Sequence, residues 1–404
     1  MKVLRWLRPA TVVGYAQVVF FSFFALGSSS ALLAQTPVTG QGLSLVQPAV
    51  PFLTITPDSR HGALGDAGVA LADNANALYW NPANLAFTKN KFGIALNYTP
   101  WLRFIIPDIN LAYVPFYLNL GERAGVVGAS LTYFSLGRIE FRDNQGVAQG
   151  DYTANELAFS LAYSRKITKN LSAAIQLRYI RSDLAGAQNT GTASLNPGTS
   201  FSGDLSLAYT KEFKKGLFGG DKPTTLNFGL NMSNLGNKIR YSGNTDAEDF
   251  LPGNFRIGTA LRSYLDEYNS ITFLFDINKL MVPYGQANEV RNKPLLEGIF
   301  GSFTSGPALS LLTFSGGVEY WYNDVFAARA GYYREDPVRG NRSYFTIGVG
   351  TKIREFHIDF AYLQPLTQQN PLQNTLRFTV GYQLAGGGLL DARGDAGKKP
   401  RRSR

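Results

Sequence analysis

The chain has 404 residues and a formal net charge of +10, with 28 Phe, 21 Tyr and no Cys. The lack of Cys excludes disulfides and cysteine-based metal or redox sites, and the residues assign no metal and no cofactor. The positive charge gathers at the two ends of the chain, before Pro9 and after Asp391, so we expect no nucleic acid as a partner.

Residues 1–34 are expected to be a secretory signal peptide. Three basic residues before Pro9 are followed by an apolar run from Val12 to Leu26, which ends at small residues and Ala34. A retained membrane anchor is the alternative, but the apolar run is short and leads into a cleavage site. Residues 35–50 contain Gly and Pro and are expected to form a flexible lead.

Residues 51–90 are expected to form an N-terminal plug, or hatch. Glycines recur every three residues, which allows close backbone packing, and an aromatic motif follows an Ala-rich stretch. The residues of this plug motif are Gly62, Gly65, Gly68, Trp80, Asn81 and Pro82. A phosphate-binding loop is excluded, because no Gly-Lys-Ser/Thr follows the glycines and no strand precedes them.

Residues 91–385 alternate between apolar and small or polar residues. For example, Phe159 and Leu161 are separated by Ser160. A period of two is typical of a strand with one apolar face and one polar face. We expect fourteen such strands, at 92–99, 109–119, 125–135, 156–165, 171–181, 201–210, 225–233, 254–263, 270–278, 313–321, 325–334, 343–352, 356–363 and 375–384.

The pattern predicts an all-β transmembrane protein. Its fold would be a 14-stranded antiparallel outer-membrane β-barrel with an N-terminal plug, with lipid outside and a polar lumen. No segment after the signal reaches ~18 consecutive apolar residues, so no transmembrane helix is expected.

The lengths of the connections predict the orientation of the barrel. Most even-numbered connections are short and all odd-numbered ones are longer; the exception is 211–224, which is even-numbered and long. Periplasmic turns are short and extracellular loops are long, so both ends of the barrel are expected in the periplasm. Residues 386–404 would then be a basic, disordered periplasmic tail.

Charged and polar residues recur at positions that should face the lumen. They could form a selective pore or a binding site, but we expect opposed charges to pair and fill the lumen. The positions are Gln176, Arg178, Asp204, Arg256, Arg262, Asp276, Glu319, Arg329, His357, Asp359 and Arg377.

Two of the expected outer loops, 100–108 and 279–312, are unusually apolar and are the candidate partner-binding surfaces. Alternatively, the first loop dips into the outer leaflet or caps the plug, and the second folds over the barrel mouth. Leu295, Ile299 and Phe303 have helical spacing, which predicts a short helix. The candidate residues are Trp101, Leu102, Phe104, Ile105, Ile106, Leu295, Leu296, Ile299, Phe300 and Phe303.

An enzymatic function has little support in the residues. The two histidines are His61 and His357, and His357 shares the expected lumen face with Asp359. A catalytic triad would also need a serine that the sequence does not select. We therefore expect a protein that is not an enzyme and assign no catalytic residue.

The segment ending in Trp80-Asn81-Pro82-Ala83 resembles the hatch of the FadL-like outer-membrane family. Members of that family are fourteen-stranded barrels with an N-terminal plug. Eleven blocks, in order, resemble more narrowly the PorV family of the type IX secretion system. Two features depart from the pattern: the sequence runs on past Leu384, and the spacer YGQANEVRNKP at 284–294 does not align with it. The blocks are 51–83, 96–114, 131–143, 161–167, 177–184, 250–261, 277–283, 298–303, 317–336, 340–350 and 370–378.

The resemblance implies an integral protein of the outer membrane of a Gram-negative bacterium. It would bind the C-terminal signal domain of exported cargo at the translocon and shuttle the cargo to the surface attachment complex. The implied partners are a large translocon barrel, cargo proteins with a C-terminal β-domain, a sortase-like attachment complex and outer-membrane lipid. The alternatives are, second, a FadL-like transporter of hydrophobic small molecules such as fatty acids and, third, an outer-membrane lipid hydrolase.

Overall fold

A computed structural model describes residues 48–71, 74–103, 105–142, 145–184, 196–214, 216, 222–241, 248–283, 291–304, 312–336, 342–367 and 370–386. The chain separates into two units, Met1–Leu43 and Ser44–Arg404, and every described residue belongs to the second. The expected signal peptide, most of the expected lead, Phe104 and all but Gly386 of the expected tail lie outside the described residues.

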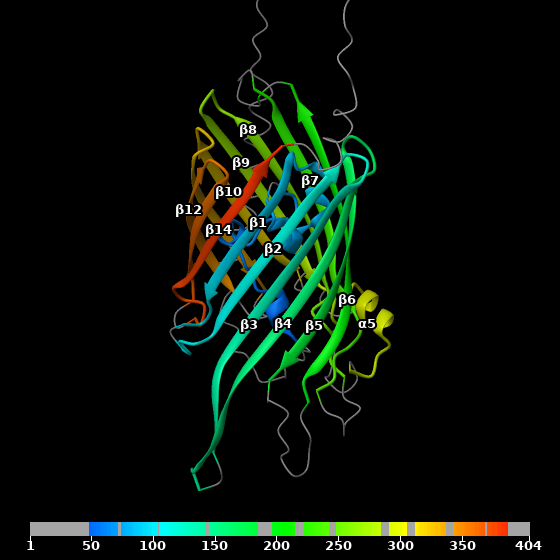
Figure 1. The fold of residues 1–404 in the computed structure, drawn as a ribbon, viewed down its shortest axis with the longest axis vertical. Helices are drawn as coiled ribbons and strands as arrows, with labels where there is room; N and C mark the ends of the chain where they lie inside the picture. Colours follow the sequence, from blue (N-terminus) through cyan, green and yellow to red (C-terminus); the bar gives the residue numbers. More distant parts are fainter. Residues whose placement is uncertain are drawn as a thin grey trace, which may run out of the picture. The chain divides into compact units, whose positions relative to one another are not determined.

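The described strands form a closed antiparallel barrel in which each strand pairs with the next and the first pairs with the last (Figure 1). This confirms the predicted 14-stranded barrel. The strands are β1 (Asn90–Pro100), β2 (Asn110–Gly121), β3 (Gly125–Arg142), β4 (Ala148–Lys166), β5 (Leu171–Asp183), β6 (Gly198–Phe213), β7 (Thr224–Gly236), β8 (Asn254–Tyr264), β9 (Asn269–Leu280), β10 (Leu312–Tyr322), β11 (Phe326–Glu335), β12 (Ser343–Ile353), β13 (Phe356–Pro365) and β14 (Thr375–Ala385).

The two faces of the barrel wall differ as the alternation predicts. On β4, Phe159 is 43% exposed and Leu161 is 54% exposed, whereas Ala158 and Ser160 between and beside them are buried. Closure of the sheet pairs the backbone groups of every strand, which is what a hydrocarbon environment requires. The apolar residues therefore face outward and the small and polar residues face the lumen.

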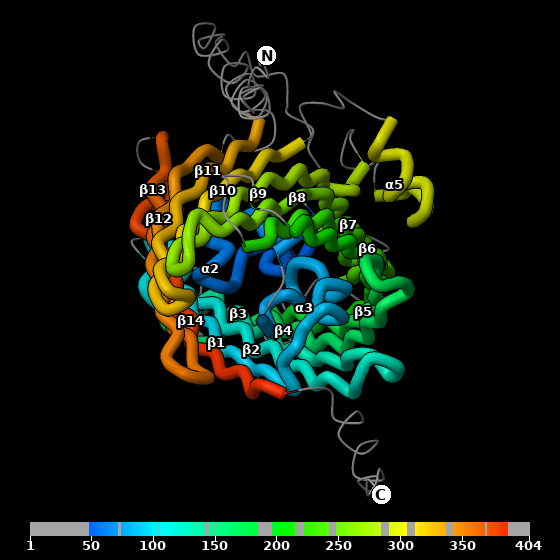
Figure 2. Tube along the Cα trace, turned by 90° about the horizontal axis from the view of Figure 1, so that it is seen from above, coloured from blue at the N-terminus to red at the C-terminus, as the bar shows by residue number. Residues whose placement is uncertain are grey.

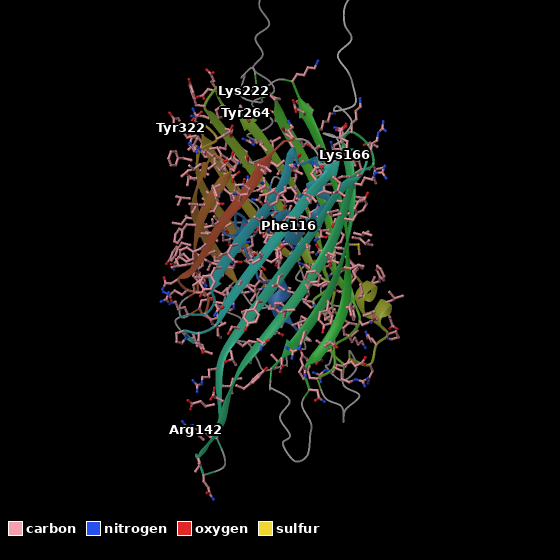
Figure 3. The ribbon with its side chains drawn as sticks, in the orientation of Figure 1. Phe116, Arg142, Lys166, Lys222, Tyr264 and Tyr322 are labelled. Carbon is pink, nitrogen blue, oxygen red and sulfur yellow. The ribbon has the colours of Figure 1, made fainter. Side chains whose placement is uncertain are left out.

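The largest difference from the predicted strands is at β3 and β4. The segment 136–155 was expected to be a loop, but the two strands continue through most of it as a hairpin, with Ile139 paired to Tyr152. Figure 3 shows the hairpin reaching away from the rest of the barrel, with Arg142 near its tip. Outside the membrane neither face of a hairpin has to be apolar, so the alternation that reveals the other strands is missing here.

Both ends of the barrel lie on the side of the short turns. Asn90 of β1 pairs with Ala385 of β14, and Lys166, Lys222, Tyr264 and Tyr322 mark the same end in Figure 3, opposite Arg142. The long connections other than the one between β6 and β7 lie at the other end.

The described helices are short, and among the described residues none is long and apolar enough to span a membrane. Figure 2 shows α2 and α3 inside the ring of strands and α5 outside it. The helices are η1 (Pro51–Thr54), α2 (Ser59–Gly62), α3 (Ala77–Trp80), η2 (Pro82–Phe87) and α5 (Leu295–Gly301).

Candidate functional site

Residues 48–89, here called the N-terminal segment, pack tightly against the inner wall. A Cβ atom at Gly62 would overlap the Arg377 side chain, and one at Gly65 would overlap the backbone of Tyr332. Gly65 also has a φ of +69°, which disfavours other residues. The glycines thus allow the close backbone approach that their spacing predicted.

The wall contributes matching glycines that the sequence did not single out. Gly317 of β10 and Gly331 of β11 are paired across the sheet, and a Cβ at either would overlap Leu64. On β7, a Cβ at Gly229 would overlap the carbonyl of Val69. Glycine on the lumen face of a strand, which weakens the strand itself, is the signal that could have revealed this packing.

Asp58 holds two parts of the N-terminal segment together. Its Oδ1 lies 2.7 Å from Nδ1 of His61 and accepts the backbone N–H of the same residue, which caps α2. Its Oδ2 accepts a hydrogen bond of 2.9 Å from Nε1 of Trp80. Burial alone would raise the pKa of the Asp58 carboxyl, but attraction to His61 and the hydrogen bonds from His61 and Trp80 outweigh it and lower the pKa from 3.8 to about 2.

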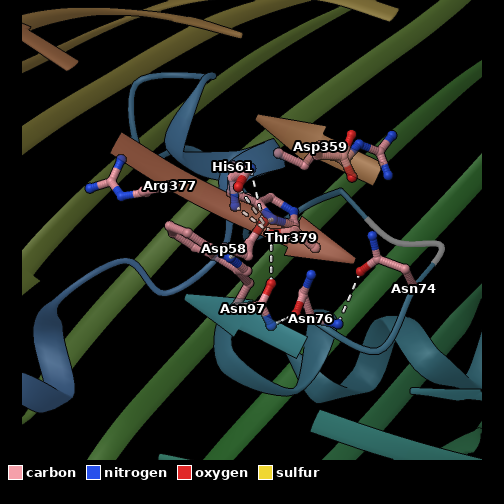
Figure 4. Close-up of polar contacts among 12 residues, drawn as sticks. Asp58, His61, Asn74, Asn76, Asn97, Asp359, Arg377 and Thr379 are labelled. Carbon is pink, nitrogen blue, oxygen red and sulfur yellow. Dashed lines mark hydrogen bonds and ion pairs between the residues drawn. The ribbon is translucent and has the colours of Figure 1, made fainter. Parts of the chain in front are cut away.

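A chain of hydrogen bonds ties the segment to the seam where the barrel closes (Figure 4). Asn97 of β1 donates to Asn76 at 2.8 Å and accepts from Thr379 of β14 at 2.7 Å. The backbone N–H of Ser59 donates to the same Thr379 hydroxyl at 2.9 Å. The first and last strands are therefore joined through side chains as well as through their ladder.

The Trp80-Asn81-Pro82 motif has a structural role. The Asn81 side chain accepts from the N–H of Ala83, which caps η2, and donates to the carbonyls of Val69 and Leu207, both at 2.9 Å. Pro82 occupies the start of η2, where its missing N–H costs nothing. The motif connects the N-terminal segment to β6.

Several of the charges in the lumen are paired, as expected. Glu319 accepts from Arg60 of the N-terminal segment and from Arg329 of β11, and Arg329 reaches Asp359 as well, all at 2.7 Å. Arg178 and Asp204 form a further ion pair, with Nη2 of the arginine 2.8 Å from Oδ2 of the aspartate. Asp276 accepts the N–H groups of residues 68 and 69 instead of pairing with a cation.

The cavities described beside the N-terminal segment are small or polar. The one between Leu78, Tyr113 and Arg178 has about 20 Å³, room for about one water molecule. The one beside Arg60 and Arg262 has about 190 Å³.

The first outer loop divides into an inward and an outward part. Trp101 and Leu102 are half-buried and pack on a cluster formed by Tyr333, Tyr344, Leu363 and Leu372. Ile105 is 59% exposed and Ile106 is 42% exposed.

The second outer loop contains the predicted helix, α5, which also has two faces. Ile299 is buried, Leu295 packs against Phe250 and Val282, and the ring of Phe303 lies 5.8 Å from that of Phe255. Phe300 is 55% exposed, and Leu296 is 67% exposed although it also lines a groove between α5 and the barrel wall. Figures 1 and 2 place α5 on the side of β6, away from β1 and β2, so the structure does not bring the two loops together.

The two carboxylates near the histidines have structural partners. His61 is bound by Asp58, and Asp359, the neighbour of His357 on β13, is engaged by Arg329. Within the described ranges, no group of three or more His, Asp or Glu residues could hold a metal ion.

Comparison with known proteins gives one family and a set of remote structural neighbours. The family described as "Type IX secretion system protein PorV" matches residues 39–287. No curated protein gives a significant match.

Three solved structures represent the structural neighbours. The toluene transporter TbuX of Ralstonia pickettii has 13% identity and a TM-score of 0.43, covering 81% of this chain and 98% of its own. A FadL homologue of Pseudomonas aeruginosa has 12% identity and a TM-score of 0.43, with the same coverage. The toluene transporter TodX of Pseudomonas putida has 13% identity and a TM-score of 0.45, covering 81% and 98%.

Proposed function

Since the chain belongs to the PorV family of type IX secretion system proteins, and is a β-barrel of the outer membrane, we propose that it carries secreted cargo between two machines of that system. It binds the C-terminal signal domain of the cargo at the translocon and delivers the cargo to the surface attachment complex. Its partners are the large translocon barrel, cargo with a C-terminal β-domain and the sortase-like attachment complex.

The observation that supports this proposal is the packing of the N-terminal segment against the inner wall of the barrel. The N-terminal segment occupies the interior through paired charges and close glycine contacts, so we propose that residues 51–90 act as a plug. A plugged barrel has to act through its outer surfaces. Exposed apolar side chains gain free energy when a partner buries them, at about 25 cal/mol per Å².

Four exposed residues of the outer loops are the proposed contacts. They are Ile105 and Ile106 of the first loop and Leu296 and Phe300 of α5. Trp101, Leu102, Leu295 and Ile299 position these residues from behind through their own packing, and Phe303, itself 38% exposed, rests its ring on Phe255. The two patches are separate, which suits a protein that contacts more than one partner.

The proposed orientation places the long connections on the cell surface. The short turns and both ends of the barrel would then be periplasmic. In this orientation both apolar patches face the outside, where cargo emerges and is attached.

The transporter alternative has less support from the described cavities. A passage for fatty acids would be a continuous apolar channel, whereas the cavities beside the N-terminal segment hold about 20 Å³ and 190 Å³ and contain Arg178, Arg60 and Arg262. The hydrolase alternative has no support from His61, whose Nδ1 is engaged by Asp58.

The test is to remove the exposed apolar side chains and follow the cargo. A variant with Ile105→Ser, Ile106→Ser, Leu296→Ser and Phe300→Ser should assemble in the outer membrane but deliver little cargo to the surface. Co-purification of the translocon and of proteins with a C-terminal β-domain should fall in parallel.

The matched control changes exposed apolar residues at the other end. The control carries Leu265→Ser and Tyr268→Ser. Leu265 and Tyr268 lie in a short turn and are 39% and 54% exposed. They should leave delivery unchanged. Normal delivery by the first variant, or bound fatty acids instead of cargo in purified protein, would refute the proposal.

A further inference from the structure

A small cavity lies between the N-terminal segment and the inner wall, and its lining carries positive charge. Its volume is about 20 Å³, which suits one water molecule or one monatomic ion. The described residues that line it include two arginines, Arg178 of β5 and Arg256 of β8, and no Asp or Glu. A counter-charge for these arginines therefore has to come from outside the lining or from an ion inside the cavity.

Arg178 has its counter-charge from the barrel wall. Its Nη2 lies 2.8 Å from Oδ2 of Asp204 on β6, the neighbouring strand. Its Nε donates to the hydroxyl of Ser160 at 3.0 Å, and its Nη1 donates to the side-chain oxygen of Asn234. Ser160 and Asn234 also line the cavity, so Arg178 already engages these two acceptors.

Arg256 is buried without such a partner. The residue is 6% exposed and forms no ion pair with a described residue, and its hydrogen bond to the carbonyl of Tyr79 is long, at 3.4 Å. The ring centroids of Tyr79 and Trp80 each lie 5.1 Å from the guanidinium carbon. Asp276 on the adjacent strand β9 accepts the N–H groups of residues 68 and 69 and does not line the cavity.

A buried arginine needs a compensating negative charge. Its guanidinium stays protonated, so the cost of burial cannot be relieved by the loss of a proton. Aromatic faces attract a cation, but less strongly than an anion in direct contact with it. An anion in the cavity would supply the missing charge beside Arg256.

The cavity also offers hydroxyl groups as donors. The hydroxyls of Tyr79 and Tyr113 are buried and form no hydrogen bond of normal geometry to a described residue. Both side chains line the cavity, and their rings meet edge to face with centroids 6.1 Å apart. A buried hydroxyl without a partner costs stability, and it can donate to an anion. One ion would therefore serve Arg256 and both hydroxyls.

We propose that this cavity binds one chloride ion between the guanidinium of Arg256 and the hydroxyls of Tyr79 and Tyr113. The volume excludes carboxylates, phosphate and other polyatomic anions. Because Tyr79 belongs to α3 and Arg256 to β8, the ion fastens the N-terminal segment to the wall. The site concerns how this segment is held in the barrel and goes beyond the proposed role in cargo delivery.

Thermal unfolding of the full-length protein in a non-ionic detergent tests the site. The melting temperature is measured in sodium chloride and in sodium gluconate at equal ionic strength, because gluconate is too large for the cavity. We expect a higher melting temperature in chloride. It should rise by about 2 °C for each tenfold increase in chloride above the dissociation constant.

Two matched substitutions separate the ion from general effects of salt. Arg256→Met removes the buried charge and should have the same melting temperature in both salts. Arg262→Met makes the same change on the same strand, at a residue whose Nη2 lies 2.7 Å from Oδ1 of Asp324. It should keep the chloride dependence of the parent protein.

Bromide identifies the ion directly and needs no variant. Crystals of the parent protein grown in sodium bromide should give an anomalous-scattering peak in the cavity, next to Arg256. A water molecule at that position in bromide would overturn the inference. So would equal melting temperatures of the parent protein in the two salts, or a chloride dependence that survives in Arg256→Met.

A bromide peak without any chloride dependence would indicate an adventitious ion only and would likewise overturn the inference. Neither cargo nor translocon is present in these measurements. The chloride site and the proposed function can therefore fail separately.

Discussion

The indole of Trp80 donates a hydrogen bond to the carboxylate of Asp58 across 22 residues of the N-terminal segment. Both side chains are at most 2% exposed, and the imidazole of His61 packs 5.0 Å from the indole. This contact joins α2 to α3 and thereby orders the part of the chain that packs against the inner wall of the barrel.

Removing only the indole N–H should destabilise the protein. Trp80→Phe keeps an aromatic ring but leaves one oxygen of a buried carboxylate without its donor, which costs ~1–3 kcal/mol. Urea unfolding monitored by loss of the barrel's resistance to protease gives the difference. The control is Trp101→Phe, which makes the same change at a half-buried indole that has no described hydrogen bond, so its loss of stability should be smaller. Equal losses of stability in the two variants would show that ring size matters and the hydrogen bond does not.

Stability should fall in acid because of Asp58. Its pKa is lowered from 3.8 to about 2 in the folded protein, so the carboxylate stabilises the fold above pH 3.8 and this contribution disappears as the pH falls toward 2. The difference corresponds to ~2 kcal/mol. Asp58→Asn should be less stable at pH 6 and should lose less between pH 5 and 2. A parallel pH dependence of the two proteins would contradict the assignment.

The charge network around Glu319 should be far more sensitive than pairs on the surface. Glu319→Gln leaves Arg60 and Arg329 buried with one fewer negative charge, and breaking such a buried network costs ~3–5 kcal/mol. Glu140→Gln removes the partner of Arg142 in the exposed hairpin and should change stability by less than ~1 kcal/mol. Denaturation midpoints of the two variants, measured in the same detergent, make the comparison.

The orientation can be read from single cysteines, because the chain has none of its own. Gln145→Cys in the β3–β4 hairpin and Glu297→Cys on α5 should react with an impermeant maleimide on intact cells. Lys169→Cys in a short turn should react only after the outer membrane is opened. If Lys169→Cys alone were labelled on intact cells, the barrel would have the opposite orientation to the one proposed.

Much of the barrel was predictable from local sequence because a strand exposes alternate residues to opposite sides. Leu161 and Ser160 illustrate this, since their difference in polarity is enough to assign the lipid and lumen faces of the strand. The hairpin formed by residues 136–142 and 148–155 was not predicted, because water surrounds both of its faces and its residues do not alternate in polarity. The resemblance of eleven sequence blocks to the PorV family predicted the family of this chain. The match over residues 39–287 confirms that prediction.

The candidate site was predictable only in part. The spacing of Gly62 and Gly65 indicated close packing, but not that Gly317 and Gly331 of the wall make room for it. Asp58 and Arg60 were not singled out, although two charges in a segment of Gly and Ala are a signal that something opposite must pair with them.

Apart from the hairpin between β3 and β4, the sequence by itself determined which residues form strands, which face of each strand is apolar and which connections are long, because these follow from the periodicity of neighbouring residues. Only the tertiary structure decided that Arg60 meets Glu319, that Trp80 meets Asp58, and that Ile299 turns inward while Phe300 turns outward. Each of these depends on where distant parts of the chain come to rest when the barrel closes, and contacts across such separations leave no local pattern in the sequence.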